Sequence, residues 1–167
     1  MPYNGKKARE ARERLAMAVL NAKTQPFETD APVQGGRVTS PYGWRKHPIL
    51  GVLKKHEGAD IAATTGTPVY ATADGYISQA QHKSSGSVRG NNVSIKHPGG
   101  QETRYEHMDR FAPAALKGGP VRKGDLIGYV GSTGRSTGPH LHYGMLDRGV
   151  PVDPFTPMVP WARYASR

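Results

Sequence analysis

Hydrophobic and polar positions alternate along several short segments that begin at residue 37. Val93 and Ile95 are separated by one polar residue, and Val69 and Ala71 have the same spacing. A period of two is typical of strands that bury one face. This pattern and its neighbouring turn residues predict eight strands: Arg37 to Ser40, Asp60 to Ala63, Pro68 to Thr72, Tyr76 to Gln81, Asn92 to His97, Glu102 to Met108, Asp125 to Val130 and His140 to Leu146.

Turn-forming residues separate these segments. The chain has 21 Gly and 14 Pro among 167 residues, and residues 97–101 have the composition of a hairpin connection. Short strands joined by such turns predict a mainly β fold, an antiparallel sandwich or barrel-like sheet. Three stretches are too long or too rich in Gly and Ser for tight turns, and we predict loops there that border a substrate groove: residues 43–55, 83–90 and 131–139.

The N-terminal region has a different sequence pattern. Residues 6–22 predict a helix with an Ala-rich apolar stripe and with Arg9 and Glu13 spaced for an i,i+4 pair. Packing of this helix on the main domain is favoured over binding to an envelope surface. Residues 24–36 resemble a linker, so the predicted organisation is a helix and linker over 1–36, a β domain over 37–155 and a tail over 156–167.

The chain is basic, with a formal net charge of +10. Residues 37–155 hold 15 Lys and Arg against 9 Asp and Glu, so most of the excess is spread over the predicted β domain. This charge favours anionic partners such as envelope polymers, but no motif for specific nucleic-acid binding is present. Without cysteine there is no disulfide or thiolate site. No apolar run reaches the 18 or so residues of a membrane span, and we expect a monomer without a secretory signal.

Two closely spaced pairs carry the candidate chemistry. His56 and Asp60 are four residues apart, and His140 and His142 are two apart. Imidazole and carboxylate are zinc ligands, and a catalytic zinc takes three protein ligands. Alternate residues of a strand share a face, so His140 and His142 can address one site. Four extended residues span roughly 13 Å, so His56 and Asp60 need a compact path, and Gly58 favours a bend over a helix. Four donors for three places leave one donor without an assignment.

A set of motifs resembles the M23 family of zinc metallopeptidases, of the lysostaphin and LytM type. The resemblance covers roughly residues 37 to 155. Its motifs occur in the family's order: Ser40-Pro41-Tyr42-Gly43-Trp44-Arg45, His56-x-Gly58-x-Asp60, Gly66-Thr67-Pro68-Val69, Tyr105-Glu106-His107, Lys123-Gly124-Asp125 and Ser132-Thr133-Gly134 through Gly138-Pro139-His140-Leu141-His142.

The resemblance implies the roles that spacing leaves open. It implies that His56, Asp60 and His142 bind one zinc ion per chain and that His107 and His140 are the catalytic histidines. Zinc lowers the pKa of a bound water toward 7, and a histidine takes the proton. We interpret His140 as the base and His107 as the transition-state stabiliser, with the exchanged assignment open.

The resemblance also implies a bacterial peptidoglycan endopeptidase. We expect cleavage of the D-alanyl to meso-diaminopimelate cross-link, because no module of the kind that binds Gram-positive walls is recognisable. The basic N-terminal helix and the missing signal predict a phage or prophage lysin, held in the host cytoplasm and released to the periplasm and cell wall, or carried in a virion.

Two alternatives compete with the interpretation as an enzyme. An inactive M23-like module that binds wall or regulates a hydrolase is expected to lack ligands, and here the set is complete. A lipoyl-like carrier domain, indicated by residues 66–75, lacks a suitable lysine hairpin and leaves the histidines unused. Of the remaining histidines, His82 is expected in a strand and solvated, His97 at a hairpin, and His47 beside the groove.

Overall fold

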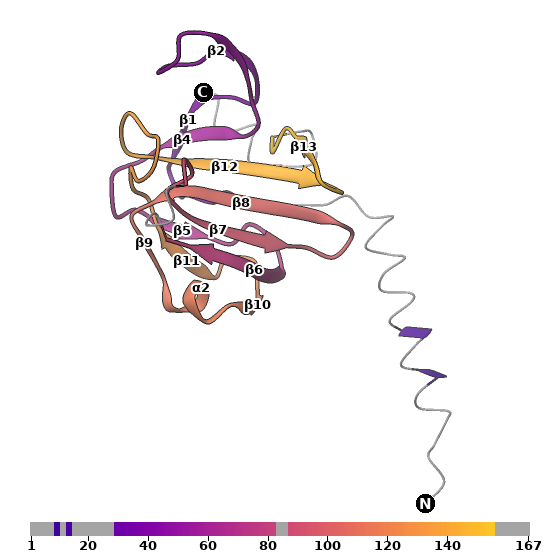
Figure 1. Cartoon of the computed structure of the whole chain (residues 1–167). Coiled ribbons are helices and arrows are strands. Elements are labelled where there is room, and N and C mark those ends of the chain that lie inside the picture. The colour runs from indigo at the N-terminus through magenta and orange to yellow at the C-terminus, as the bar shows by residue number, and fades with distance from the viewer. Residues whose placement is uncertain (1–8, 11–12, 15–28, 83–86, 156–167) are drawn as a thin grey trace, which may run out of the picture.

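The computed structural model describes residues 9–10, 13–14, 29–82 and 87–155, and nearly half of these residues form antiparallel strands (Figure 1). The large sheet has eight strands in the order β1-β4-β12-β8-β7-β6-β10, with β13 paired to β12. Its strands are β1 (Arg37–Ser40), β4 (Ala59–Ala62), β6 (Gly75–Gln81), β7 (Asn91–Lys96), β8 (Gln101–Met108), β10 (Gly119–Val121), β12 (His140–Asp147) and β13 (Val150–Val152).

Two smaller units accompany the large sheet. One is a three-stranded sheet in the order β5-β11-β9, and the other is a hairpin of β2 and β3 that stands at the top of Figure 1. The bounds are β2 (Gly43–Lys46), β3 (Leu53–His56), β5 (Pro68–Tyr70), β9 (Arg110–Phe111) and β11 (Leu126–Tyr129), with one short helix, α2 (Pro113–Lys117). The predicted mainly β, antiparallel fold is therefore confirmed.

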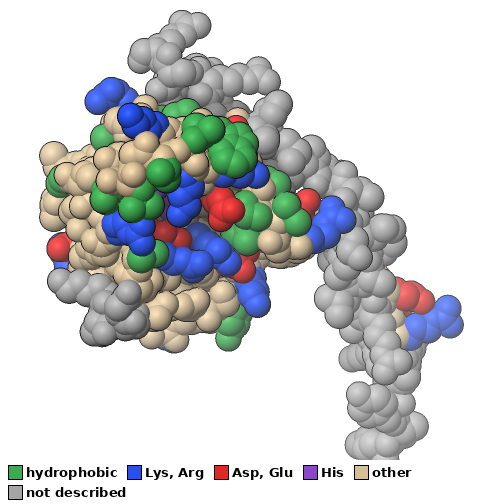
Figure 2. All heavy atoms as spheres, turned by 45° about the horizontal axis from the view of Figure 1, so that its top comes forward, with side chains coloured by type: hydrophobic (Ala, Val, Ile, Leu, Met, Phe, Trp, Pro, Cys, Tyr) green, Lys and Arg blue, Asp and Glu red, His purple; other side chains and the backbone are tan. Residues whose placement is uncertain are grey.

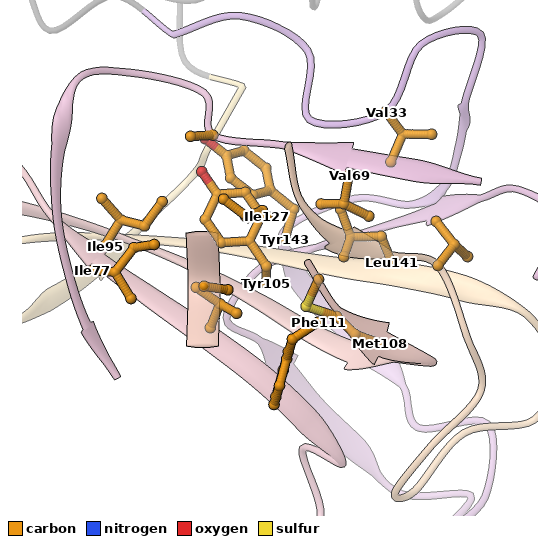
Figure 3. Close-up of a cluster of buried hydrophobic side chains, with 14 of the residues drawn as sticks. Val33, Val69, Ile77, Ile95, Tyr105, Met108, Phe111, Ile127, Leu141 and Tyr143 are labelled. Carbon is orange, nitrogen blue, oxygen red and sulfur yellow. The ribbon is translucent and has the colours of Figure 1, made fainter. Parts of the chain in front are cut away.

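The core lies between the large and the small sheet. Val69 and Ile127 of the small sheet pack in one cluster with Leu141, Tyr105 and Tyr143 of the large sheet (Figure 3). Alternation assigns the two faces of β12, because Leu141 and Tyr143 are fully buried while His140 and His142, which alternate with them, are only partly covered. The strand thus holds apolar side chains in the core and presents its histidines on the other face.

A chain of hydrogen bonds crosses this core. The Tyr105 hydroxyl lies 2.9 Å from Thr72 Oγ1, which is 3.0 Å from the Tyr143 hydroxyl. On the other side, Thr103 Oγ1 donates to Tyr105 and lies 2.8 Å from His97 Nε2. Because each hydroxyl has a partner, these polar groups are buried without being left unsatisfied.

The predicted strands agree with the observed ones to within two residues at their ends, and the differences lie in the segments between them. The stretch 43–55, expected to be a loop, contains the hairpin β2–β3. Both faces of this hairpin are largely exposed, so its sequence has no apolar alternation to mark it. The elements β9, β10, β13 and α2 were also not predicted, because two to five residues are too few for a periodic signal. His97 starts its hairpin as expected, but its side chain is buried.

The predicted helix over 6–22 lies mostly outside the described residues. Its four described residues are helical, and Arg9 Nε lies 2.8 Å from Glu13 Oε1, as the i,i+4 spacing predicts. Within the part of the chain that the structure describes, no helix has the length and apolar character of a membrane span.

Candidate metal centre and catalytic groove

The path from β3 to β4 brings His56 and Asp60 together. His56 ends β3, Glu57 and Gly58 form a bend, and β4 begins at Ala59. His56 Nε2 then lies 3.2 Å from Asp60 Oδ1. The predicted bend is confirmed, and it gives the compact path that an extended segment could not provide.

Strand pairing adds His142 to this pair. β12 lies beside β4, and in that register His142 is directly opposite Asp60. His142 Nδ1 is 2.9 Å from Asp60 Oδ1 and 3.1 Å from His56 Nε2. Three potential ligand atoms from segments some eighty residues apart therefore converge on one point.

The spacing of these atoms fits zinc. Two ligand atoms that each lie about 2.05 Å from a tetrahedral ion are about 3.3 Å from one another. The three separations of 2.9, 3.1 and 3.2 Å are close to that value. Two nitrogens and one oxygen are also a donor set that zinc accepts, so the residues present fit the metal.

Neighbouring groups orient these ligands. His56 Nδ1 donates to the Pro41 carbonyl at 2.9 Å, which leaves the Nε2 lone pair facing the other donors. Arg45 Nη2 lies 3.4 Å from the outer carboxylate oxygen of Asp60. Burial alone would raise the pKa of Asp60, but the adjacent His142 and His56 rings hold it well below its usual range, so the carboxylate is charged.

His140 and His107 lie on the same face, next to the three donors. Their rings face each other with centroids 4.9 Å apart, and His140 Nε2 is 3.7 Å from Asp60 Oδ1. Nδ1 of His140 lies 2.8 Å from the Gly138 carbonyl, and Nδ1 of His107 lies 2.8 Å from the Thr133 carbonyl. A carbonyl only accepts, so both Nδ1 atoms carry a proton and donate it to these carbonyls.

His107 is held in an unusual conformation. Its φ is +63°, in the left-handed region that is uncommon for residues other than glycine. Its backbone N–H donates to the Arg89 carbonyl at 2.8 Å, outside the β7–β8 ladder. Burial lowers its pKa to about 4, so the ring is neutral at pH 7. Strained backbone conformations of this kind cluster at functional sites, where they fix the position of a side chain.

Glu106 was not singled out from the sequence, yet it lies at this site. It is directly opposite His142 across the β12–β8 pair, and its side chain is 13% exposed. Burial raises its pKa, and Arg89 Nε lies 3.3 Å from its carboxylate. Only its place in the Tyr-x-His motif between Tyr105 and His107 could have signalled it.

These groups line a groove of about 560 Å³. Its walls include parts of all three stretches predicted to border a groove, among them Trp44 of the hairpin, Val88, and Arg135 of the loop before His140. His47 also lines the groove, as expected. His82 follows β6 rather than lying in it, is exposed, and has its ring 4.8 Å from that of Phe111.

Comparison with known proteins assigns this site to a family. The model of peptidase family M23 matches residues 54–154, which is more than half of the chain. The chain belongs to peptidase family M23. Over 129 residues it is 48% identical to the DD-carboxypeptidase/endopeptidase Mpg of Neisseria meningitidis, a match that covers 77% of this chain and 29% of that protein. The M23 chain thus spans about three tenths of that relative.

Solved structures of other peptidases resemble this one over about three quarters of the chain. A zinc-containing peptidase from Vibrio cholerae has a TM-score of 0.68 and 39% identity, and the match covers 77% of this chain and 39% of that one. The catalytic domain of the prophage-encoded M23 protein EnpA from Enterococcus faecalis has a TM-score of 0.62 and 34% identity, with 77% and 95% covered. The resemblance seen in the sequence motifs is thereby confirmed at the level of family and fold.

Proposed function

We propose that this M23 protein is a zinc-dependent peptidoglycan endopeptidase. The observation that carries the proposal is the convergence of three zinc-type donors, with separations of 2.9 to 3.2 Å, beside two groove-lining histidines whose Nδ1 atoms donate to backbone carbonyls. An inactive wall-binding or regulatory module is the alternative. The complete donor set disfavours it, because binding alone does not require a metal with two histidines facing it.

The site residues divide into two groups. His56 Nε2, Asp60 Oδ1 and His142 Nδ1 would hold the metal. A zinc ion held there supplies a Lewis acid that polarises a carbonyl and lowers the pKa of a water. Because its Nε2 lies beside the ligand atoms, we assign His140 to take a proton from water and return it to the leaving amine. His107, on the facing side, contacts the developing oxyanion, and the exchanged assignment is the alternative.

We propose the D-alanyl to meso-diaminopimelate cross-link as the bond cleaved. The Neisseria meningitidis relative is named a DD-carboxypeptidase/endopeptidase, and its similarity extends over 77% of this chain. The charge of the groove supports an anionic peptide substrate, because six Lys and Arg side chains line it against three acidic ones.

The biological setting we propose is that of a phage or prophage lysin acting at the cell wall. The match to the prophage-encoded EnpA domain covers 95% of that domain, and the net charge of +10 favours contact with anionic envelope polymers. Added protein should then lyse cells whose outer membrane has been permeabilised. If the turbidity of such cells does not fall although purified sacculi are cleaved in parallel, the role as a lysin is excluded and the proposed enzyme activity stands.

One experiment tests the activity. Purified sacculi are digested with the protein, with the protein plus a chelator, and with His107→Ala, and the products are identified by mass spectrometry. We expect monomeric muropeptides with a free D-alanyl carboxylate, and no products in the two controls. Pentaglycine tested in parallel separates the substrates: cleavage of pentaglycine alone would refute the assigned bond, and products unaffected by the chelator would refute the metal.

A further inference from the structure

The charges of the groove are unevenly satisfied. Three of its arginines have acidic partners, because Arg45 lies 3.4 Å from Asp60 and Arg89 lies 3.3 Å from Glu106. The third, Arg104, lies 2.7 Å from Glu102. Arg135 also lines the groove and is exposed, and none of the acidic side chains in the described part of the chain forms an ion pair with it. Its guanidinium is therefore available to a ligand.

The backbone that carries Arg135 is held firmly. Its N–H donates to the Val88 carbonyl at 2.9 Å. Next to this hydrogen bond the two backbone segments approach each other closely at glycines. A Cβ on Gly134 would lie 2.3 Å from the Gly90 nitrogen, and a Cβ on Gly90 would lie 2.4 Å from Thr133. Both glycines have positive φ. A loop fixed in this way presents its side chain from a defined point and reduces the ordering cost of binding.

This point is close to the catalytic histidines. The residue after Arg135 is Ser136, whose hydroxyl lies 3.3 Å from His140 Nδ1 and donates to the Gly138 carbonyl. Two residues before Arg135, the Thr133 carbonyl accepts from His107 Nδ1. Arg135 therefore lies in the same loop as Thr133 and Ser136, the residues that contact the His107 and His140 rings.

The part of the groove formed by the β2–β3 hairpin has a different character. On the β2–β3 hairpin, Trp44 and Leu53 line the groove and are 72% and 71% exposed. Figure 2, which brings the top of the molecule forward, shows hydrophobic side chains mixed with Lys and Arg and few acidic ones. A peptide with apolar side chains and free carboxylates matches the chemistry of such a groove.

We propose that Arg135 is a specificity residue that binds a free carboxylate next to the scissile amide. The inference rests on the proposed function. In the D-alanyl to diaminopimelate cross-link, the carbon that bears the scissile nitrogen also bears a free carboxylate. A guanidinium matches a carboxylate with two parallel N–H to O hydrogen bonds, which neither a lysine nor an amide can reproduce. Arg135 touches the substrate but exchanges no proton with it.

The test compares two substrates. A cross-linked muropeptide dimer with the free diaminopimelate carboxylate is paired with the same dimer carrying a carboxamide there, and kcat/KM is measured for the protein, R135Q and R135K. Removing a hydrogen-bonding partner from a charged group predicts that R135Q loses about 10- to 100-fold on the carboxylate dimer and less than about 3-fold on the amide. R135K should recover only part of the loss. K117Q, which removes one positive charge in α2 outside the groove, should change neither value.

Each outcome has one meaning. An equal loss on both dimers would overturn the proposal, because it would indicate a role in the loop rather than in carboxylate binding. Equal rates of the unaltered protein on the two dimers would overturn it as well. If the unaltered protein cleaves neither dimer while the zinc content is one per chain, the proposed function fails first, and the Arg135 proposal fails with it.

Discussion

Replacing Gly58 by alanine tests whether the bend between His56 and Asp60 is shaped around His142. A Cβ at position 58 would lie 2.6 Å from His142 Nε2 and 2.7 Å from the Tyr143 carbonyl oxygen. Backbone contacts of that kind do not relax easily, because Tyr143 lies in the core strand β12 and is fully buried. The imidazole and the bend must therefore move apart.

The size of the effect follows from these distances. Ordinary van der Waals contact for a Cβ begins at 3.4 Å, so the ring of His142 has to move by about 0.8 Å. Zinc ligands tolerate deviations of only about 0.2 Å. Loss of ligand support of this kind lowers metal affinity by about 10- to 100-fold. The extra methyl group should also destabilise the metal-free protein by about 1–3 kcal/mol, the usual cost of overpacking.

Gly144→Ala is the matched control. Its Cβ would lie 4.0 Å from the same His142 nitrogen and 3.5 Å from the Glu57 carbonyl oxygen, which are ordinary contacts. Zinc affinity is measured by competition with a chromophoric chelator, and thermal unfolding of the metal-free proteins gives the stability. We expect Gly58→Ala to lose affinity and Gly144→Ala to retain it within about 3-fold. Wild-type affinity in Gly58→Ala, or an equal loss in both variants, would refute the reasoning.

Three further predictions address the site and the core. His142→Ala should lose zinc, whereas His140→Ala and His107→Ala should keep zinc and lose most activity. Metal analysis of the three purified variants checks this expectation. Loss of zinc from His140→Ala, with zinc still bound in His142→Ala, would overturn the assignment. Burial lowers the pKa of His97 from 6.5, so its contribution to stability is present above about pH 6.5 and is lost as the pH falls toward the folded pKa. His97→Gln should flatten that dependence in denaturation curves between pH 7.5 and 5, and an unchanged slope would contradict it. Tyr105→Phe removes a hydroxyl with three buried hydrogen bonds and should cost about 1–3 kcal/mol in urea unfolding, while a change under 0.5 kcal/mol would show that the network contributes little.

Several features of the fold were readable from local pattern. Val93 and Ile95 marked a strand because they lie in the hydrophobic core, while Asn92 and Ser94, which alternate with them, are polar although also buried. Gly58 marked a bend because a glycine between two donors at i and i+4 disfavours both helix and strand. The hairpin β2–β3 was not readable, since both of its faces are largely exposed and Trp44 and Leu53 lie in solvent. Alternation reports burial, so a strand without a buried face leaves no such signal.

The sequence by itself determined the chemistry of the site: the donor types, the shared face of His140 and His142, and the family motifs that select among four donors. Only the tertiary structure decided where these groups meet, because strand register is set by long-range packing of the core rather than by local spacing. The pairing of β12 with β4 places His142 beside Asp60, and its pairing with β8 brings Glu106 to the same site. The same long-range packing leaves Arg135 without an acidic partner among the described residues, a property that no spacing along the chain encodes.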